Sequence, residues 1–507
     1  MGERMLASGS AKQAWNSTRV TRLLRIDYPI IQAPFGGLPS QQLTANVSNL
    51  GGLGSLGAVT LSSSAITEVI GEIRSLTTKP FAINLWVSTS DREAAHISSQ
   101  LIEEKMRELG RYYAELGIEP PLGVESKPQN FEAQVRAAID ARSPVLSFVY
   151  GIPPSEILDE CRTHEIKTIG TATTPEEAVA LEQAGLNFIV ASGFEGGGHR
   201  GSFLRSPAES LMGSFSLIPQ VVDAVEVPVI AAGGIADGRG LLAALALGAE
   251  AVQIGTAFLP CAGSGASKAY RAALLSETAK WTELTDAFTG RLARGVRNRL
   301  MNEFKDMSRP SLPFPSQHAM TQTVAAPASA REKVELMTLW AGQSAGLSRH
   351  TEATELISQL IAEADGSATN DKKEWLQTRP GERCLIHISA ADTNGLYSLV
   401  EIVSNPGDGT PLHVHEREDE HIIVVEGTAR IVYGDKIFDA QPGDVAILRK
   451  GIPHAWGNRT NAELRIAVFA RPGGIEEVLR LVATTAEIDL AAIAERFRVK
   501  VIGSAPF

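Results

Sequence analysis

Short, almost uninterrupted apolar runs recur along the first half of the chain, and longer segments with a helical pattern separate them. Such runs are typical of parallel strands that are covered on both faces, because neither face meets water. Between two of the runs lies TPEEAVALEQAGL, where Thr174 is the predicted N-cap of a helix with acidic residues in its first turn. The predicted strands are residues 29–34, 52–58, 79–86, 143–151, 166–172, 187–193, 228–234 and 251–259.

Eight strand–helix units predict a (β/α)8 TIM barrel of the α/β class, in preference to an open doubly wound sheet. The segment between the third and fourth strands is too long for one crossover. Its polar stretch at about 91–116 predicts an extra helix, which would form a lid or a subdomain. From residue 261 to about 365 the pattern is helical and irregular, and this predicts a helical extension of the barrel. We therefore assign residues 20–365 to one barrel domain.

The pattern changes after the polar stretch ADGSATNDKKEW, and residues 366–380 are predicted to form a linker. Short alternating segments with turn residues follow, and they predict an all-β sandwich or small barrel over residues 381–475. A helical tail is predicted for residues 476–507.

Length and composition restrict the classes of function that need to be considered. A chain of 507 residues with 44% hydrophobic residues is expected to form two or three globular domains. The net charge of −11 without a basic cluster argues against a nucleic-acid partner. The three cysteines, Cys161, Cys261 and Cys384, are far apart, which fits a reducing compartment. No apolar run suits a signal peptide or a membrane span, so we expect a cytoplasmic protein with no membrane partner.

The loop GFEGGGHRGSF, residues 193–203, places one imidazole on an unusual number of glycines. An ordinary surface loop needs one or two glycines, whereas a run of three lets the backbone approach a flat or anionic ligand. Active sites of this barrel lie where the strands end, and the loop follows the predicted sixth strand. His199 is therefore the predicted reactive group.

Two further loops have the character of phosphate sites. AAGGIADGRG follows the seventh predicted strand, with Gly233 and Gly234 predicted to open a helix, and QIGTAF follows the eighth predicted strand. Barrels hold phosphate after these two strands, with backbone N–H groups and a helix N-terminus. Either loop alone would be read as a tight turn, but the pair favours a phosphate site at Gly233, Gly234, Gly255 and Thr256.

Eight segments in this order along residues 20–350 carry a family resemblance: IIQAPFGG, SNLGGLGSLGA, KPFAINLW, SGFEGGGHRGSF, PVIAAGGIADGRG, GAEAVQIGTAFL, FTGRLARGVRNR and LWAGQ. The chain resembles the FMN-dependent nitronate monooxygenases, formerly called 2-nitropropane dioxygenases. The resemblance implies FMN as cofactor and His199 as the catalytic acid or base. The cofactor-binding residues that it implies are Gln32, Ala33, Pro34, Phe35, Gly36, Asn84, Thr171, Ser192, Gly197, Gly198, Gly233, Gly234, Gln253, Gly255 and Thr256.

The implied reaction is the oxidation of alkyl nitronates or nitroalkanes with O2 to a carbonyl compound and nitrite. A protonated imidazole would bind the nitronate anion, and a neutral one would take a proton from a nitroalkane. The stretch PSLPFPSQHAMTQ lacks the tyrosines and the lysine that line the substrate pocket in some bacterial members. The same scaffold and glycine–histidine loop occur in NAD(P)H-dependent flavin reductases of the enoyl-acyl-carrier-protein reductase and quinone reductase types, so this alternative stays open.

A second chemical site is predicted in the all-β part, in GDGTPLHVHEREDEHIIVVEG. His413 and His415 are two residues apart on a predicted strand, so both imidazoles point to one face. Glu420 follows on the next segment and His454 comes one hairpin later, whereas His421 should point to the opposite face. Three imidazoles and a carboxylate suit a divalent transition metal such as Fe, Mn, Ni, Cu or Zn.

The glycines around these ligands carry a second resemblance. The spacing from Gly407 through the ligands to Gly427 is similar to the first cupin motif, and Gly443, Gly451, His454 and Asn458 are similar to the second. Arg449 stands where proline is usual. The resemblance implies a metal-binding cupin, which is either a second enzyme or a sensory or oligomerising module, with a homodimer through the cupin domain as one expectation.

Overall fold

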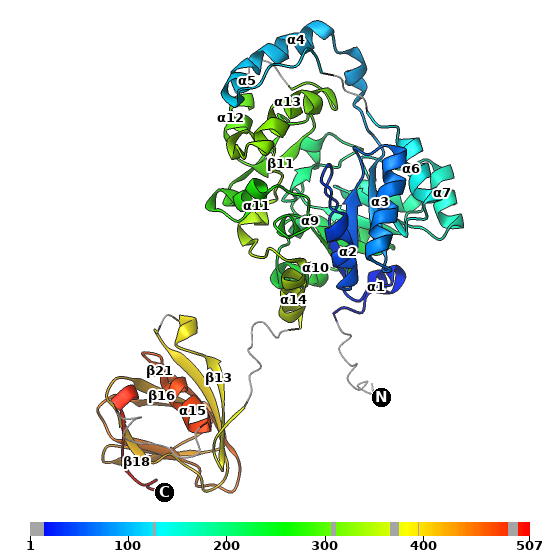
Figure 1. Cartoon of the computed structure of the whole chain (residues 1–507). Helices are drawn as coiled ribbons and strands as arrows, with labels where there is room; N and C mark the ends of the chain where they lie inside the picture. Colours follow the sequence, from blue (N-terminus) through cyan, green and yellow to red (C-terminus); the bar gives the residue numbers. More distant parts are fainter. Residues whose placement is uncertain (1–14, 125–127, 306–310, 366–374, 394, 485–494) are drawn as a thin grey trace, which may run out of the picture. The chain divides into compact units, whose positions relative to one another are not determined.

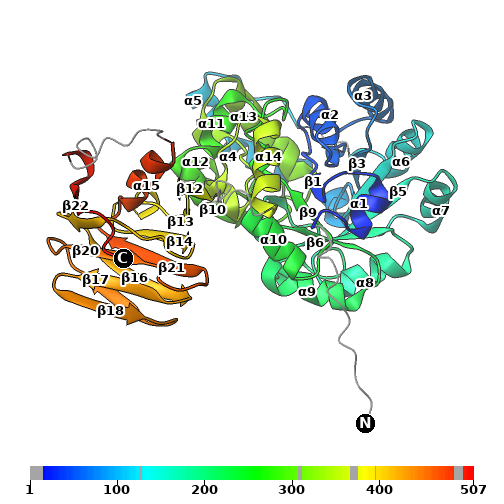
Figure 2. The same ribbon diagram turned by 90° about the horizontal axis from the view of Figure 1, so that it is seen from below.

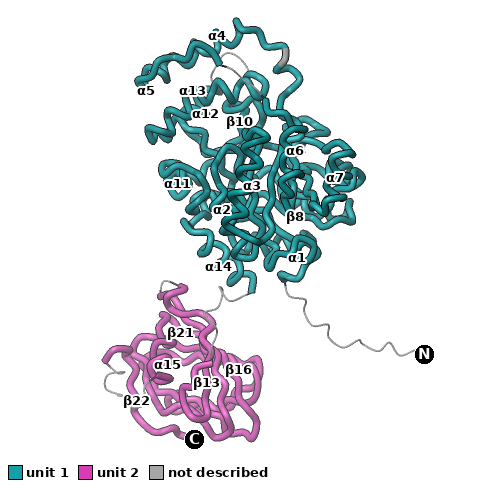
Figure 3. The backbone as a smooth tube through the Cα atoms, turned by 45° about the vertical axis from the view of Figure 1, so that its right-hand side comes forward, with its two compact units in different colours: residues 1–368 teal, residues 369–507 magenta. Residues whose placement is uncertain are grey.

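The computed structural model describes residues 15–124, 128–305, 311–365, 375–393, 395–484 and 495–507. The chain divides into two compact units, residues 1–368 and 369–507, which Figure 3 shows in different colours. Within the described ranges no helix is long and apolar enough to cross a membrane.

The first unit contains a barrel of eight parallel strands, joined in the order β1-β9-β8-β6-β5-β4-β3-β2. Parallel bridges from Ile31 to Leu53 and from Gly36 to Gly57 join β1 to β2 and complete the ring. All eight predicted strands are present, which confirms the TIM-barrel prediction. Their bounds are β1 (Ile30–Gln32), β2 (Gly54–Gly57), β3 (Phe81–Trp86), β4 (Val145–Val149), β5 (Lys167–Ala172), β6 (Phe188–Ser192), β8 (Val229–Ala232) and β9 (Ala251–Ile254).

The eighth predicted strand is shorter than expected. It ends at Ile254, and Thr256–Phe258 form a 3-10 helix, η3, so the prediction of a strand to residue 259 was wrong. At the other end of the barrel, helix α1 (Arg19–Leu24) contributes Val20 and Leu24 to an apolar cluster with the first residues of several strands. This helix therefore closes the end where the strands begin and leaves the opposite end for chemistry.

Helices surround the strands as a ring, as Figures 1 and 2 show. Helix α8 begins after Thr174, whose hydroxyl accepts a hydrogen bond from the Glu177 N–H, so the predicted cap is confirmed. The ring consists of α2 (Gln41–Asn49), α3 (Ser63–Leu76), α6 (Phe131–Asp140), α7 (Ser155–Thr163), α8 (Pro175–Gln183), α9 (Ser214–Ala224), α10 (Gly238–Ala246) and α14 (Ala353–Ala364).

The segment between the third and fourth strands forms η1 (Arg92–His96), α4 (Ser99–Glu108) and α5 (Gly110–Leu116) in place of the single predicted helix. Helix α5 packs against α13 (Ser316–Ala330), where the Tyr113 hydroxyl lies 2.7 Å from Thr323 Oγ1. Helices α4, α5, α12 (Arg299–Lys305) and α13 gather at one end of the unit (Figure 1).

The extension also contains strands that its irregular pattern did not predict. β10 (Thr282–Thr285), β11 (Ala293–Val296) and β7 (Gly198–His199) form a small antiparallel sheet. The glycine–histidine loop thus pairs with a strand about 95 residues further along the chain. Helix α11 (Lys268–Leu274) precedes β10 along the chain.

The second unit is an antiparallel β-structure of two sheets. Alternating side chains such as Val400, Ile422, Ile431 and Trp456 form its core. One sheet has the order β12-β13-β14-β21-β16-β19 and the other β18-β17-β20-β15-β22. Their bounds are β12 (Leu376–Arg379), β13 (Glu382–Ile388), β14 (Ser398–Ser404), β15 (Leu412–His415), β16 (Asp419–Glu426), β17 (Ala429–Tyr433), β18 (Lys436–Ala440), β19 (Val445–Leu448), β20 (His454–Gly457), β21 (Leu464–Arg471) and β22 (Val499–Gly503).

Two predictions at the edges of this unit were wrong. The tail is not wholly helical, because α15 (Ile475–Thr484) is followed by β22, which pairs with β15; residues 485–494 lie outside the described part. The predicted linker, residues 366–380, includes strand β12 from Leu376 onward, and its residues 366–374 also lie outside the described part.

Candidate active site

His199 lies at the end of the short strand β7, where it pairs with Ala293 of β11. Its Nε2 is 2.8 Å from the Thr289 Oγ1, and this hydroxyl also donates a hydrogen bond of 3.2 Å to the Arg291 carbonyl. A hydroxyl that donates elsewhere is an acceptor for the ring. This arrangement favours the tautomer with its proton on Nε2 and an unprotonated Nδ1.

Two tryptophans flank the imidazole. The ring centroids of Trp86 and Trp340 lie 5.0 Å and 5.1 Å from that of His199, with interplanar angles of 74° and 52°. Burial lowers the pKa of His199 to about 3, and the positive charge of Arg291 acts in the same direction. The imidazole is therefore neutral near neutral pH.

Arg291 supplies a fixed positive charge beside this imidazole. Its side chain is 8% exposed and forms an ion pair of 2.7 Å with Asp91. It also donates to the carbonyl and the hydroxyl of Ser88, at 3.0 and 3.1 Å. The guanidinium lies over three aromatic rings, those of Trp86, Tyr150 and Phe314.

The glycine run permits contacts between backbones that a side chain would prevent. A Cβ on Gly197 would lie 2.6 Å from the Ala341 carbonyl carbon and from the Gly342 nitrogen. The Gly342 N–H in turn donates to Thr256 Oγ1 at 2.9 Å. The loops after β6 and β9 and the LWAGQ segment therefore meet on one face of the barrel.

The other predicted loops reach the same face. A Cβ on Gly233, which has φ +102°, would lie 2.9 Å from the Gly193 carbonyl oxygen. A Cβ on Gly255 would lie 3.4 Å from the Cβ of Ala33. Gly198 and Gly234 also have positive φ, and within the described part a Cβ on Gly198 would meet nothing within 4 Å. This combination leaves backbone at the strand ends accessible to a flat or anionic ligand.

One detail of the predicted phosphate site was wrong. No helix begins at Gly233, because α10 begins at Gly238. Its first N–H groups are already bound by the Asp237 side chain, which accepts from Arg239 and Gly240, and by Glu363. Donors for a phosphate are thus limited to the loops after β8 and β9, without the N-terminus of α10.

Several predicted cofactor residues are held in the barrel wall. Gln32 is fully buried, and its Oε1 accepts a hydrogen bond of 3.0 Å from the Ser55 N–H. The Asn84 amide donates to Ser147 Oγ at 3.0 Å. The remaining predicted positions lie at or just after strand ends: Pro34, Phe35 and Gly36 after β1, Thr171 near the end of β5, Ser192 at the end of β6 and Gln253 near the end of β9.

A buried cation fixes the loop that carries His199. Arg200 is 1% exposed and donates to the carbonyls of Gly193 and Ser192, both at 2.7 Å. Burial lowers the pKa of this guanidinium to about 10, which leaves it charged at neutral pH. At the C-terminal end of the loop, the Glu177 carboxylate accepts hydrogen bonds from the N–H groups of Phe203 and Leu204.

Sequence reasoning did not assign a role to the residues that surround His199. Thr289 and Arg291 belong to the FTGR segment and Trp340 to LWAGQ. Both segments carry the family resemblance, which implies no role for these three residues. Phe314 comes from the PSLPFPSQHAMTQ stretch, so this stretch reaches the site although it lacks tyrosine and lysine. The polar and aromatic residues of these segments could have indicated a site. That the segments lie next to His199, however, follows only from the fold.

The four predicted metal ligands lie together in the second unit. The ligand atoms of His413, His415, Glu420 and His454 are all within 4.8 Å of one another, and all four residues are buried. Glu420 Oε1 is 3.2 Å from His415 Nε2, and Glu420 Oε2 is 3.4 Å from His454 Nε2. The neighbouring imidazoles hold the pKa of the Glu420 carboxyl well below its usual range despite its burial.

The backbone fixes the orientation of two of these imidazoles. His413 Nδ1 is 2.8 Å from the Pro411 carbonyl, and His454 Nδ1 is 2.9 Å from the Ile452 carbonyl. A protonated Nδ1 that donates to a carbonyl leaves Nε2 as the ligand atom. His454 Nε2 is buried and has no hydrogen bond within the described part of the chain. His421 faces the opposite side, with its ring 5.7 Å from that of Phe469, as strand alternation predicts.

With this geometry established, comparison with known proteins identifies the family. The model of the family described as "Nitronate monooxygenase" matches residues 17–363, more than half of the chain. The chain belongs to the nitronate monooxygenase family. The barrel unit is accordingly a flavin-dependent oxidoreductase of this family, and the model described as "Cupin domain" matches residues 400–470.

Relatives of the nitronate monooxygenase family cover the barrel unit. A Staphylococcus aureus protein named "Probable nitronate monooxygenase" is 40% identical over 348 residues, 68% of this chain and 97% of that protein. A nitroalkane oxidase from Streptomyces ansochromogenes has 35% identity and a TM-score of 0.63, over 69% of this chain and 99% of its own. FabK from Thermotoga maritima has 28% identity and a TM-score of 0.55, over 69% and 97%.

Proposed function

We propose that this nitronate monooxygenase-family barrel oxidises alkyl nitronates with O2 to a carbonyl compound and nitrite, with FMN as its cofactor. The observation that supports this proposal most is the neutral imidazole of His199, held between two tryptophans on the face where the glycine loops meet. A nitroalkane and its nitronate differ by one proton on carbon. A neutral imidazole in the glycine loop could accept this proton, so the site suits this pair of substrates.

The residues fit FMN. Gly234, Gly255 and Thr256 would bind the phosphate through backbone N–H groups, and Gly197 and Gly198 would allow the ring system to approach the backbone. The positions after β1 and at Asn84 would line the ring. When bound, FMN supplies the electron acceptor for the oxidation.

The protein's own groups account for binding and proton transfer. The Nε2–H of His199 donates to Thr289, so Nδ1 is the atom that would accept a proton from the carbon next to the nitro group. The Arg291 guanidinium favours an anion at this site, whether it is bound as nitronate or formed from a nitroalkane. The rings of Trp86 and Trp340 contact the imidazole and provide an apolar surface beside it.

The test is nitrite formation by the purified, flavin-loaded chain with propionate 3-nitronate under air. We expect nitrite formation and O2 consumption in the wild type. A nitronate already lacks the proton that Nδ1 would accept, so His199→Asn is also assayed with the neutral nitroalkane, for which we expect a strong loss of turnover with the flavin spectrum unchanged. A variant that keeps wild-type turnover would show that His199 is not the catalytic group.

The second candidate is an NAD(P)H-dependent flavin reductase. The similarity to FabK over 69% of this chain supports it, but the 28% identity to FabK is lower than the 35% identity to the nitroalkane oxidase, so it ranks second. The two functions differ in what reduces the flavin: a nitronate in the first case and a reduced nicotinamide in the second.

We further propose that the cupin unit binds one divalent transition metal through His413, His415, Glu420 and His454. The support is the burial of all four side chains, with their ligand atoms within 4.8 Å of one another, and the carbonyls that orient two Nδ1 atoms. With a metal bound, one carboxylate and three imidazoles would leave positions for water or a small ligand. Metal analysis of the purified chain by mass spectrometry tests this, with Glu420→Gln expected to lower the metal content.

A further inference from the structure

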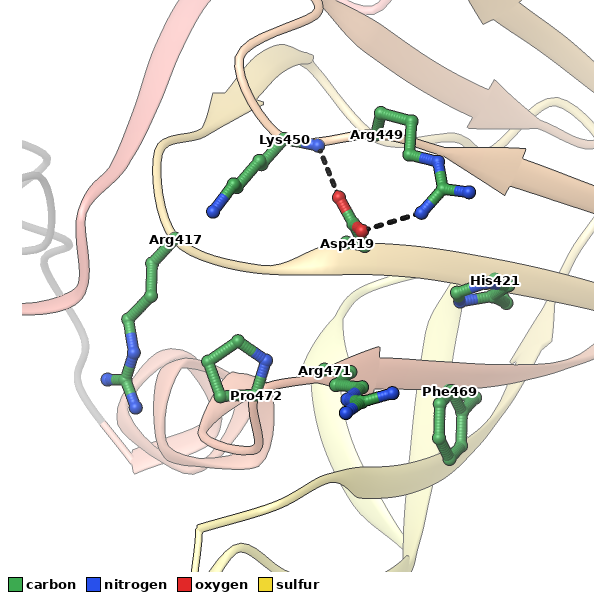
Figure 4. A pocket seen from close by; sticks show the side chains of 8 residues that line it. All are labelled: Arg417, Asp419, His421, Arg449, Lys450, Phe469, Arg471 and Pro472. Carbon is green, nitrogen blue, oxygen red and sulfur yellow. Dashed lines mark hydrogen bonds and ion pairs between the residues drawn. The ribbon is translucent and has the colours of Figure 1, made fainter.

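The outer face of the six-stranded sheet of the cupin unit carries a cavity of about 370 Å³. It lies on the face opposite the histidine cluster, because Asp419 and His421 alternate along β16 with Glu420, which points inward. Figure 4 shows its lining: Arg417, Asp419, His421, Arg449, Lys450, Phe469, Arg471 and Pro472.

The cavity has an excess of positive charge. Four of its side chains are cationic and one is a carboxylate, in a chain whose net charge is −11. The single carboxylate, Asp419, is already bound: it accepts from Arg449 at 2.8 Å and from the Lys450 backbone N–H at 2.9 Å. Arg417 lies 3.7 Å from Glu418. Within the described ranges the Lys450 ammonium and the Arg471 guanidinium have neither a hydrogen bond nor an ion pair.

An aromatic surface adjoins these cations. Arg471 and Phe469 lie side by side on β21 in Figure 4, with His421 close to the ring. The Phe469 ring is held in place by stacking on Tyr397, at 5.1 Å between centroids and 27° between planes. Cations next to a fixed aromatic ring form a surface for a ligand that is both anionic and flat.

We propose that this cavity binds a small planar organic anion, a carboxylate carried on a flat apolar ring. The carboxylate would accept hydrogen bonds from the Arg471 guanidinium and the Lys450 ammonium, since guanidinium matches a carboxylate in a bidentate manner. The ring of the ligand would pack against Phe469 and Pro472. A cavity of this size is in the range that small-molecule sites occupy.

The experiment is calorimetric titration of the full chain at low ionic strength with benzoate as the probe. We expect saturable binding, with benzamide, which lacks the charge, and acetate, which lacks the ring, each weaker by about tenfold. Arg471→Gln and Lys450→Met should each weaken benzoate binding by about tenfold. Benzoate could also bind near Arg291 in the barrel, and this binding would be the same in wild type and in the cavity variants. The quantity compared is therefore the difference in benzoate affinity between wild type and each variant.

Arg430→Gln is the matched control. This arginine lies on β17, pairs with Asp439 at 2.7 Å and is not part of the cavity, so its loss should leave benzoate binding unchanged. Lys450→Met keeps the hydrogen bond from the backbone N–H of residue 450 to Asp419, so we expect this variant to fold. It tests the proposal even if Arg471→Gln does not fold. The proposal is overturned if benzoate does not saturate by about 10 mM, or if both cavity variants bind it like wild type. A dimer that dissociates in Arg471→Gln would also overturn it, because the cations would then serve contact between copies.

Discussion

Replacing Gly197 by alanine should destabilise the barrel and disorganise the site, because this position has no room for a side chain. The added Cβ would lie 2.6 Å from the Ala341 carbonyl carbon and the Gly342 nitrogen, about 1 Å inside a normal contact. Moving the 341–342 backbone away would break the bond from Gly342 N–H to Thr256 Oγ1 and weaken that from Gln343 N–H to the Glu195 carbonyl.

The magnitude follows from these contacts. Overpacking costs about 1–3 kcal/mol, and each hydrogen bond contributes about 1 kcal/mol, so the expected loss is about 2–4 kcal/mol. Chemical denaturation of the barrel transition measures it, together with the flavin content of the purified variant, which should fall. Gly71→Ala is the control: this glycine lies in α3 with nothing within 4 Å of an added Cβ among the described atoms, and alanine there should stabilise by about 0.5–1 kcal/mol. A Gly197→Ala protein within about 0.5 kcal/mol of wild type and fully loaded with flavin would refute the reasoning.

Four further predictions concern His199, Thr289 and Glu420. The pKa of His199 lies at about 3, below the 6.5 of a free histidine, so turnover should not fall through its protonation between about pH 8 and pH 5. Because the pKa of His199 is lower in the folded state, its contribution to the free energy of unfolding is fully present above pH 6.5 and is lost as the pH falls toward 3. Acid unfolding of wild type and His199→Asn measures this contribution. Thr289→Val removes the hydrogen bond to Nε2, so nitrite formation should drop about tenfold with flavin still bound; an unchanged rate would show that the hydroxyl does not position the ring. Glu420→Gln should lower the metal content without changing the rate of nitrite formation by the barrel. Full metal occupancy in this variant would show that Glu420 is not a metal ligand.

The eight barrel strands could be predicted because each is buried on both faces and therefore reads as a continuous apolar run. The small sheet of β7, β10 and β11 could not be predicted, because its strands are only two to four residues long and β7 pairs with β11 only after the chain has folded back. Strand β22 was missed for a related reason. It follows a helical pattern and becomes a strand through pairing with β15, about 85 residues earlier.

The site was predictable to a similar extent. The glycine run singled out His199, and the two-residue spacing of His413 and His415 singled out the metal cluster, because both are local patterns. The environment of His199 was not local: Thr289 is 90 residues away and Arg291 pairs with Asp91 across 200 residues. Thr289 sets the tautomer of the imidazole, and burial together with the charge of Arg291 keeps it neutral, so its chemistry could be derived only from the fold.

The most direct test of the central claim is a rapid-mixing measurement of flavin absorbance in the purified chain without oxygen. Propionate 3-nitronate and NAD(P)H are added in separate runs at equal concentration. The account predicts that the nitronate bleaches the flavin band rapidly and that NAD(P)H leaves it unchanged over the same time. Rapid bleaching by NAD(P)H, with no response to the nitronate, would contradict it.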